Sequence, residues 1–268
     1  MFTMLIISAC ASGSKEKKEE PVDVNNASVE TLFSRATKAL ENERYKEATK
    51  FFEEVERQHP YSQFSTRAQL MSAYSSYLDQ RYDEAVISLD RYIQLHPGSS
   101  DVDYAYYLKA LSFYEQISDV RRDQQRTVEA IQALNTLIKR FPESEYSRDA
   151  ALKRDLTLDH LAGKEMEIGR YYLERGHINA AINRFRSVVL NFDTTSHVAE
   201  ALHRLVEAYV TLGLKNEATQ VAAVLGHNYP GSRWYERSYA LLDDNQRQTI
   251  QDDRGIVERT LDRLLKPG

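Results

Sequence analysis

Apolar and small residues recur along this chain at fixed distances from five alanines. The residue four positions after each alanine is apolar, so that the two together form a row that one helix face would bury. Twelve positions before four of the alanines stands another small or apolar residue, which places a second helix before the first. The alanines are Ala48, Ala85, Ala130, Ala181 and Ala218, the later residues are Phe52, Leu89, Leu134, Phe185 and Ala222, and the earlier residues are Ala36, Ala73, Gly169 and Val206. The third repeat breaks the earlier row, because Ser118 is in phase and Ala110 lies eight residues too early.

Prolines mark the ends of these repeats. Twelve positions after the alanines stand Pro60, Pro97, Pro142 and Pro230, and Asp193 takes that place in the fourth repeat. The chain has only six prolines, so four at one phase are not accidental. Proline lacks an N–H group and biases the preceding residue away from helical angles, so it stops a helix. A serine two residues after each proline is placed to cap the next helix. These serines are Ser62, Ser99, Ser144 and Ser232.

This spacing of small, large apolar and proline positions is typical of the tetratricopeptide repeat, whose two helices cross closely where side chains are small. We therefore predict an all-α solenoid of about five helix-turn-helix repeats. Residues 232–242 are expected to add a capping helix, because the exposed end of a solenoid needs a polar outer face. A generic helical bundle with incidental prolines is the alternative.

Three segments depart from the regular repeat. A polar insertion around Asp119 separates the helices of the third repeat, and residues 146–175 form either one very long helix or two helices joined near Gly163. We place N-terminal repeats at 28–142, with Ser28 as a first cap, C-terminal repeats and the cap at 143–243, and a charged helical tail at 244–268. The tail either folds back as a cap or docks on a partner through one apolar stripe. That stripe comprises Ile256, Val257, Leu261, Leu264 and Leu265.

The N-terminal stretch carries a candidate lipid anchor. Residues 1–9 are mostly apolar and lead to Cys10, the only cysteine of the chain. An aliphatic residue and two small residues before a cysteine resemble a bacterial lipobox, where the signal peptide is cleaved and the cysteine is acylated. We predict a signal-peptide remnant at 1–9, whose true start lies upstream, lipidation at Cys10, and a flexible tether at 10–27 with a span of about 20–25 Å. Ala11, in place of the aspartate that marks inner-membrane retention, favours the outer membrane. The alternative is a ragged terminus with an accidental cysteine.

Composition and motifs weigh against most catalytic and cofactor-dependent functions. A net charge of −5 argues against nucleic-acid binding, and the common phosphate-loop and zinc-helix motifs are absent from the sequence. The seven histidines are scattered without a set of carboxylates or cysteines that would complete a metal site. Adjacent acidic pairs such as Glu53 and Glu54 do not converge from one helix face. We therefore expect no catalytic residues, no metal and no cofactor, and interpret the chain as a binding protein.

Stacked helix pairs curve into a solenoid whose concave surface binds extended peptides or partner helices. The chain has seventeen tyrosines, which offer a large amphipathic contact area and are enriched at protein interfaces. Any single tyrosine on a repeat helix is nevertheless more often an ordinary packing residue.

More specific marks are Val102-Asp103-Tyr104, Arg122-Asp123, the segment from Tyr171 to Gly176, and Asn183-Arg184. With the lipobox, the tether and the unequal repeats, they resemble the ComL/YfiO family of outer-membrane protein assembly lipoproteins. The resemblance covers residues 28–232. It implies a non-enzymatic, lipid-anchored protein on the periplasmic face of the outer membrane.

The resemblance also implies partners and site residues. The partners are the POTRA domains of a β-barrel insertase, other assembly lipoproteins, and unfolded outer-membrane proteins that end in an aromatic residue and a free carboxylate. The N-terminal repeats would receive this C-terminal signal near Lys46, Arg57, His59, Tyr61 and Tyr74, and Arg184 would contact the insertase. His59 stands where the family often has tyrosine. Another periplasmic tetratricopeptide lipoprotein, scaffolding cell-wall enzymes, is the alternative.

Overall fold

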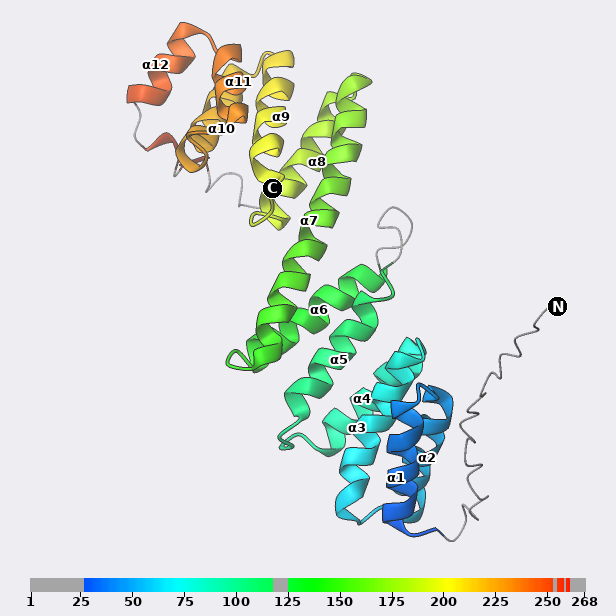
Figure 1. Cartoon of the computed structure of the whole chain (residues 1–268). Coiled ribbons are helices and arrows are strands. Elements are labelled where there is room, and N and C mark those ends of the chain that lie inside the picture. The colour runs from blue at the N-terminus through cyan, green and yellow to red at the C-terminus, as the bar shows by residue number, and fades with distance from the viewer. Residues whose placement is uncertain (1–26, 118–124, 253–254, 258, 261–268) are drawn as a thin grey trace, which may run out of the picture.

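The computed structural model describes residues 27–117, 125–252, 255–257 and 259–260, and this part of the chain contains twelve α-helices and no strand. Figure 1 shows the helices stacked in series into an elongated solenoid, which confirms the predicted fold class. The helices are α1 (Val29–Glu41), α2 (Tyr45–Gln58), α3 (Gln63–Leu78), α4 (Tyr82–Leu95), α5 (Val102–Tyr114), α6 (Gln125–Arg140), α7 (Glu145–Glu174), α8 (Ile178–Asn191), α9 (Val198–Thr211), α10 (Lys215–Asn228), α11 (Arg233–Leu241) and α12 (Asp244–Asp252).

The predicted rows of small and apolar residues form the interfaces between paired helices. All five alanines and all five residues four positions later are fully buried, as are Ala36, Ala73 and Val206. Ala110 of α5 is also fully buried, although it is out of phase with the alanine of α6. The extra residues lie between the two helices of the third repeat, so they change the spacing in sequence without removing Ala110 from the interface.

The turns inside four repeats share one backbone conformation. The residue after each C-cap has a positive φ: 58° at Glu43, 59° at Gln80, 76° at Gly176 and 73° at Gly213. The following N–H group donates to a carbonyl five residues back, as from Arg44 to Ala39 over 2.9 Å. This hydrogen bond is the signature of the Schellman motif, which satisfies the last carbonyls of a helix. Glycine occupies this position in the fourth and fifth repeats, where a positive φ carries no steric cost.

The serine caps were predicted only in part. Ser28, Ser144 and Ser232 accept hydrogen bonds from backbone N–H groups of the first helical turn. Ser62 occupies an N-cap, but its buried hydroxyl has no hydrogen-bond partner within the described residues. The expectation for Ser99 was wrong, because Asp101 is the N-cap of α5. The Ser99 hydroxyl instead lies 2.8 Å from the phenol oxygen of Tyr92 and accepts from the Asp101 N–H.

Residues 145–174 form one continuous helix, which settles the alternative left open at Gly163. The 30 residues of α7 span about 45 Å. Its first turns pack with α5 and α6 around Ala150, and its last turns pack with α8 and α9 around Met166. Leu152 and Leu156, between these two clusters, are 62% and 56% exposed. The helix therefore joins the N-terminal and C-terminal halves of the solenoid (Figure 1).

The C-terminal end of the solenoid is closed by α11 and α12. The Gln246 amide of α12 donates to the Lys215 carbonyl and to the Thr219 hydroxyl of α10, both over 2.9 Å. Ile256 is buried, and Val257 packs against the C-terminal core that contains Leu202 and Leu225. The described part of the tail thus folds back as a cap. Leu261, Leu264 and Leu265 lie outside the described residues, as do residues 1–26 with Cys10 and the insertion around Asp119.

From α1 to α7, the odd-numbered helices lie on the inner side of the stack. Helices α1, α3, α5 and α7 contact one another in succession, whereas α2, α4 and α6 lie farther apart. Closer spacing on the side of the odd-numbered helices makes that side concave. Across the described ranges, no helix is both long and apolar enough to cross a membrane.

Candidate functional site

Six tyrosines on and beside the odd-numbered helices form two groups of contacting rings, which together we call the tyrosine band. It comprises Tyr74 and Tyr77 of α3, Tyr82 of α4, Tyr104 and Tyr107 of α5, and Tyr146 of α7. Neighbouring ring centroids are 5.6 Å apart for Tyr77–Tyr82, 6.4 Å for Tyr74–Tyr104, 5.2 Å for Tyr104–Tyr146 and 5.1 Å for Tyr107–Tyr146. All six are partly exposed to solvent.

A polar pair lies at the α7 end of the band. The Tyr107 hydroxyl donates to Oδ2 of Asp149 over 2.6 Å, and Nζ of Lys153 lies 2.7 Å from the same oxygen. The hydrogen bond from Lys153, followed by that from Tyr107, lowers the pKa of Asp149, so this carboxylate is charged at neutral pH. Lys153 also lies 5.8 Å from the ring centroid of Tyr114. The arrangement fixes Tyr107 in one orientation.

Burial raises the pKa values of several phenols in the band. It raises the pKa of Tyr77 to about 12, and it is also the main cause of the raised pKa values of Tyr104 and Tyr107. A neutral phenol offers an apolar face with one hydroxyl that donates and accepts hydrogen bonds. The band therefore suits an extended peptide with aromatic side chains, whose rings stack on tyrosine and whose backbone groups bond to the hydroxyls.

The residues predicted from the N-terminal repeats lie in two places. Arg57, His59 and Tyr61 are together at the turn from α2 to α3. Arg57 is ion-paired with Glu54, with its Nε 2.9 Å from Oε2, and Nε2 of His59 lies 3.2 Å from the carbonyl oxygen of Ala27. Tyr61 is fully exposed. Of this group, Tyr61 is free to meet a partner without first breaking an internal contact.

Lys46 lies at the opposite end of α2, about 16 Å from Arg57 along the helix axis. One turn further along α2, the Thr49 hydroxyl accepts a hydrogen bond from Arg81 of the α3–α4 turn over 3.0 Å. Lys46 is therefore at the same end of the repeats as Tyr77 and Tyr82. It is exposed and has no ion-pair partner among the residues described. Tyr74 is part of the tyrosine band itself.

Arg184 ties α8 to α7. Its Nη1 lies 3.1 and 3.3 Å from the two carboxylate oxygens of Glu165, whose side chain is 15% exposed, whereas that of Arg184 is 43% exposed. The guanidinium group thus has one side on Glu165 and one side in solvent. A carboxylate from a partner would have to bind this guanidinium group together with Glu165.

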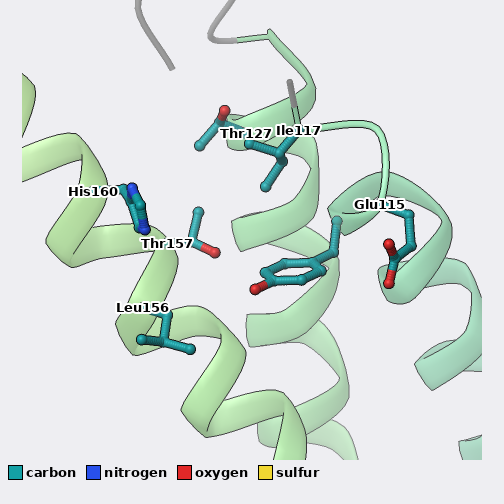
Figure 2. A pocket seen from close by; sticks show the side chains of 7 residues that line it. Glu115, Ile117, Thr127, Leu156, Thr157 and His160 are labelled. Atoms are coloured by element: carbon teal, nitrogen blue, oxygen red, sulfur yellow. The ribbon is translucent and has the colours of Figure 1, made fainter. Parts of the chain in front are cut away.

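A recess of about 270 Å³ lies between the end of α5, the start of α6 and the middle of α7 (Figure 2). Leu156, Thr157 and His160 of α7 face Ile117 and Thr127 across it. The Thr127 hydroxyl is buried without a hydrogen-bond partner within the described part. Glu115 and His160, at opposite sides of the recess, share no hydrogen bond there, so no acid–base pair is formed. Among all the residues that the structure describes, no three metal-ligating side chains come together.

Stacked helix pairs with tyrosines along the concave side define a tetratricopeptide-repeat solenoid. Residues 25–225 match the model of the YfiO family, which is described as "Outer membrane lipoprotein". The chain belongs to this family.

Relatives support the assignment over most of the chain. The outer membrane protein assembly factor BamD of Caulobacter vibrioides is 48% identical over 264 residues, which cover 97% of this chain and 87% of the relative. The protein of the same description from Rickettsia prowazekii is 46% identical over 246 residues, covering 92% and 97%. Among solved structures, the TPR2AB domain of yeast Sti1 aligns with 88% of this chain and 96% of its own at a TM-score of 0.41 and 12% identity.

Proposed function

We propose that this chain is a non-enzymatic subunit of the machinery that assembles outer-membrane β-barrel proteins. The relatives from Caulobacter and Rickettsia are outer membrane protein assembly factors and match nearly the whole chain. A solenoid that binds polypeptides is the kind of scaffold such a role needs.

The tyrosine band is the observation that carries the proposed mechanism. Unfolded barrel proteins end in an aromatic residue followed by a free carboxylate, and they arrive as extended chains. Contacting rings of the band are 5.1–6.4 Å apart, somewhat less than the about 6.6–6.8 Å between alternate side chains on one face of an extended strand. Lys46, at the α3–α4 end, supplies a cation for the terminal carboxylate, since it has no ion-pair partner in the described part of the chain.

The turn carrying Arg57, His59 and Tyr61 forms a second contact for the client. We place it there because Tyr61 is fully exposed and two cationic or titratable side chains lie beside it. A client that spans both ends of α2 would be held over about 16 Å, the length of roughly five extended residues.

The C-terminal repeats bind the POTRA domains of the insertase in this proposal, with Arg184 at the contact. Acylation at Cys10 anchors the chain to the periplasmic face of the outer membrane, and residues 10–27 act as the tether. Other assembly lipoproteins are expected to bind the same complex.

Pull-down in detergent tests the proposed function. The full chain carrying a C-terminal affinity tag should capture a β-barrel insertase from solubilised outer membranes. Capture of cell-wall synthases or hydrolases in place of the insertase would contradict the proposal and support the alternative of a cell-wall scaffold.

A further inference from the structure

The only tryptophan of the chain, Trp234 at the start of α11, is surrounded by arginines. The Cζ atoms lie 4.7 Å from its ring centroid for Arg233, 5.2 Å for Arg237 and 5.8 Å for Arg204. Guanidinium groups over an aromatic face are attracted by its quadrupole. Three on one ring make this the densest basic and aromatic cluster in the described structure.

The ring is held in place from α9. His203 lies beneath it at 5.2 Å between ring centroids, and Nδ1 of His203 is 2.8 Å from the Ser238 hydroxyl of α11. His203 is only 3% exposed. The tryptophan therefore sits on a rigid, buried base and serves as a fixed support for the arginines around it.

The three arginines differ in how their charge is used. Arg204 is neutralised by Glu207 at 2.7 Å and by Glu200 at 3.4 Å. Arg233 and Arg237 are exposed, and within the described residues neither forms an ion pair, not even with Glu236 of the same helix. Two unneutralised guanidinium groups thus stand one helical turn apart on a chain whose net charge is −5.

We propose that Arg233 and Arg237, supported by Trp234, form a docking site for an acidic protein segment that presents two carboxylates about one helical turn apart. A guanidinium stacked on an aromatic face keeps its N–H edge free, and that edge bonds a carboxylate through two parallel hydrogen bonds. Stacking also restricts the side chains before binding, which lowers the entropic cost of ordering them. The site lies on α9 and α11, away from the tyrosine band, and does not depend on client binding.

A protein segment is favoured over a lipid headgroup by position. Helix α11 lies at the opposite end of the solenoid from α1, where the proposed tether enters (Figure 1). The two halves pack on α7 around Ala150 and Met166, which are about 24 Å apart along the helix axis. A tether of about 20–25 Å holds the α1 end, rather than the α11 end, near the membrane.

The fluorescence of Trp234 gives a direct measurement, since no other tryptophan contributes. The full chain carrying Cys10→Ser, which cannot be acylated, is titrated with an alanine-rich helical peptide that has two glutamates four positions apart. The same peptide with glutamines serves as the probe control. We expect a saturable change in emission with the acidic peptide alone, weakening as the salt concentration rises.

Arginine variants decide whether the two side chains are responsible. Each charge-assisted pair is worth about tenfold in affinity, so Arg233→Ala with Arg237→Ala should weaken binding by about a hundredfold, measured by calorimetry. The matched control is Arg175→Ala, which removes an exposed arginine 4.5 Å from the ring centroid of Tyr171 and should leave binding unchanged. Circular dichroism confirms that both variants keep their helical content.

Three results would overturn the proposal. The acidic and glutamine peptides could bind alike, the double variant could bind the acidic peptide as tightly as the parent chain, or phosphatidylglycerol vesicles could change the emission of Trp234 while the acidic peptide does not. The last result would assign the arginines to a lipid surface.

Discussion

Gly169 of α7 and Phe185 of α8 are in direct contact: a Cβ atom on Gly169 would lie 2.5 Å from Cε1 of the Phe185 ring. The ring is fully buried and packs in the C-terminal core, so it has no free space into which to move. Glycine at this position is thus what lets the two helices of the fourth repeat cross closely.

Gly169→Ala should destabilise the protein. Overpacking costs about 1–3 kcal/mol, and the helical preference of alanine over glycine returns about 1 kcal/mol, so we expect a net loss of up to about 2 kcal/mol in the free energy of unfolding. Urea denaturation of the variant and the parent chain measures this difference in the free energy of unfolding. Phe185→Leu in the same chain should recover part of the loss. Gly98→Ala is the control, because a Cβ there meets nothing within 4 Å; equal effects at both glycines would refute the close crossing.

Replacing a left-handed turn residue of the first two repeats with glycine should stabilise the protein. Glu43 and Gln80 adopt the conformation that glycine occupies at Gly176 and Gly213. A side chain at positive φ costs about 1 kcal/mol, so Glu43→Gly should raise the free energy of unfolding by about 0.5–1 kcal/mol. Gly213→Ala should lower it by about the same amount, although a Cβ there contacts nothing. A loss of stability in Glu43→Gly would show that the Glu43 side chain matters more than its backbone.

The lowered pKa of Glu207 should make the stability of the protein depend on pH. Hydrogen bonds from His203 and then Arg204 lower the pKa of this carboxyl to about 2, against the opposing effect of burial. A group whose pKa is lower in the folded state stabilises the fold above its ordinary pKa of about 4.3, and this contribution is lost as the pH falls toward 2. Glu207→Gln should cost about 2 kcal/mol at neutral pH, and the difference from the parent chain should vanish near pH 2. Thermal unfolding between pH 2 and 7 measures it, and a constant difference would contradict the assignment.

Arg184 tests whether one guanidinium serves both the fold and a partner. Arg184→Glu replaces the ion pair with two neighbouring carboxylates. Because the Arg184 side chain is 43% exposed, we expect the lost pair to cost about 0.5–1 kcal/mol, and the variant should weaken capture of the insertase without changing the helical circular dichroism. The exchanged variant Arg184→Glu with Glu165→Arg restores the internal pair. We expect its stability to recover but capture to remain weak. Recovery of both would mean that Arg184 acts only by tying α8 to α7.

The repeat architecture was predictable because it depends on short spacings along the chain. Positions such as Ala48 and Phe52 show a helix face directly, and a proline such as Pro60 marks where the helix ends. The same spacings predicted the C-terminal cap at 232–242, but they left open whether residues 146–175 form one long helix or two. The helix-start role of Ser99 was wrong because its hydroxyl bonds to Tyr92, a contact that a cap pattern does not reveal.

The candidate sites were harder to predict, since they depend on which helices lie side by side. Tyr74, Tyr104 and Tyr146 come from three different helices and meet only through the stacking of α3, α5 and α7. Tyrosine content alone does not separate them from packing residues. The pairing of Trp234 with His203 likewise joins α11 to α9, and the only signal in the sequence is a lone tryptophan between arginines. Glu43 and Gln80 gave no signal, because glutamate and glutamine rarely adopt a positive φ.

Site-specific photocrosslinking of a client peptide tests the central claim most directly. A photoreactive amino acid is placed in turn at Tyr74, Tyr104 and Tyr146 and, as a control, at Tyr171, which is 50% exposed near the end of α7. The probe is an extended peptide with alternate aromatic residues and a free C-terminal phenylalanine. We predict crosslinks at the three band positions, with a marked reduction when the peptide is amidated or Lys46→Ala is introduced. Crosslinks at Tyr171 with none at the band would contradict the account.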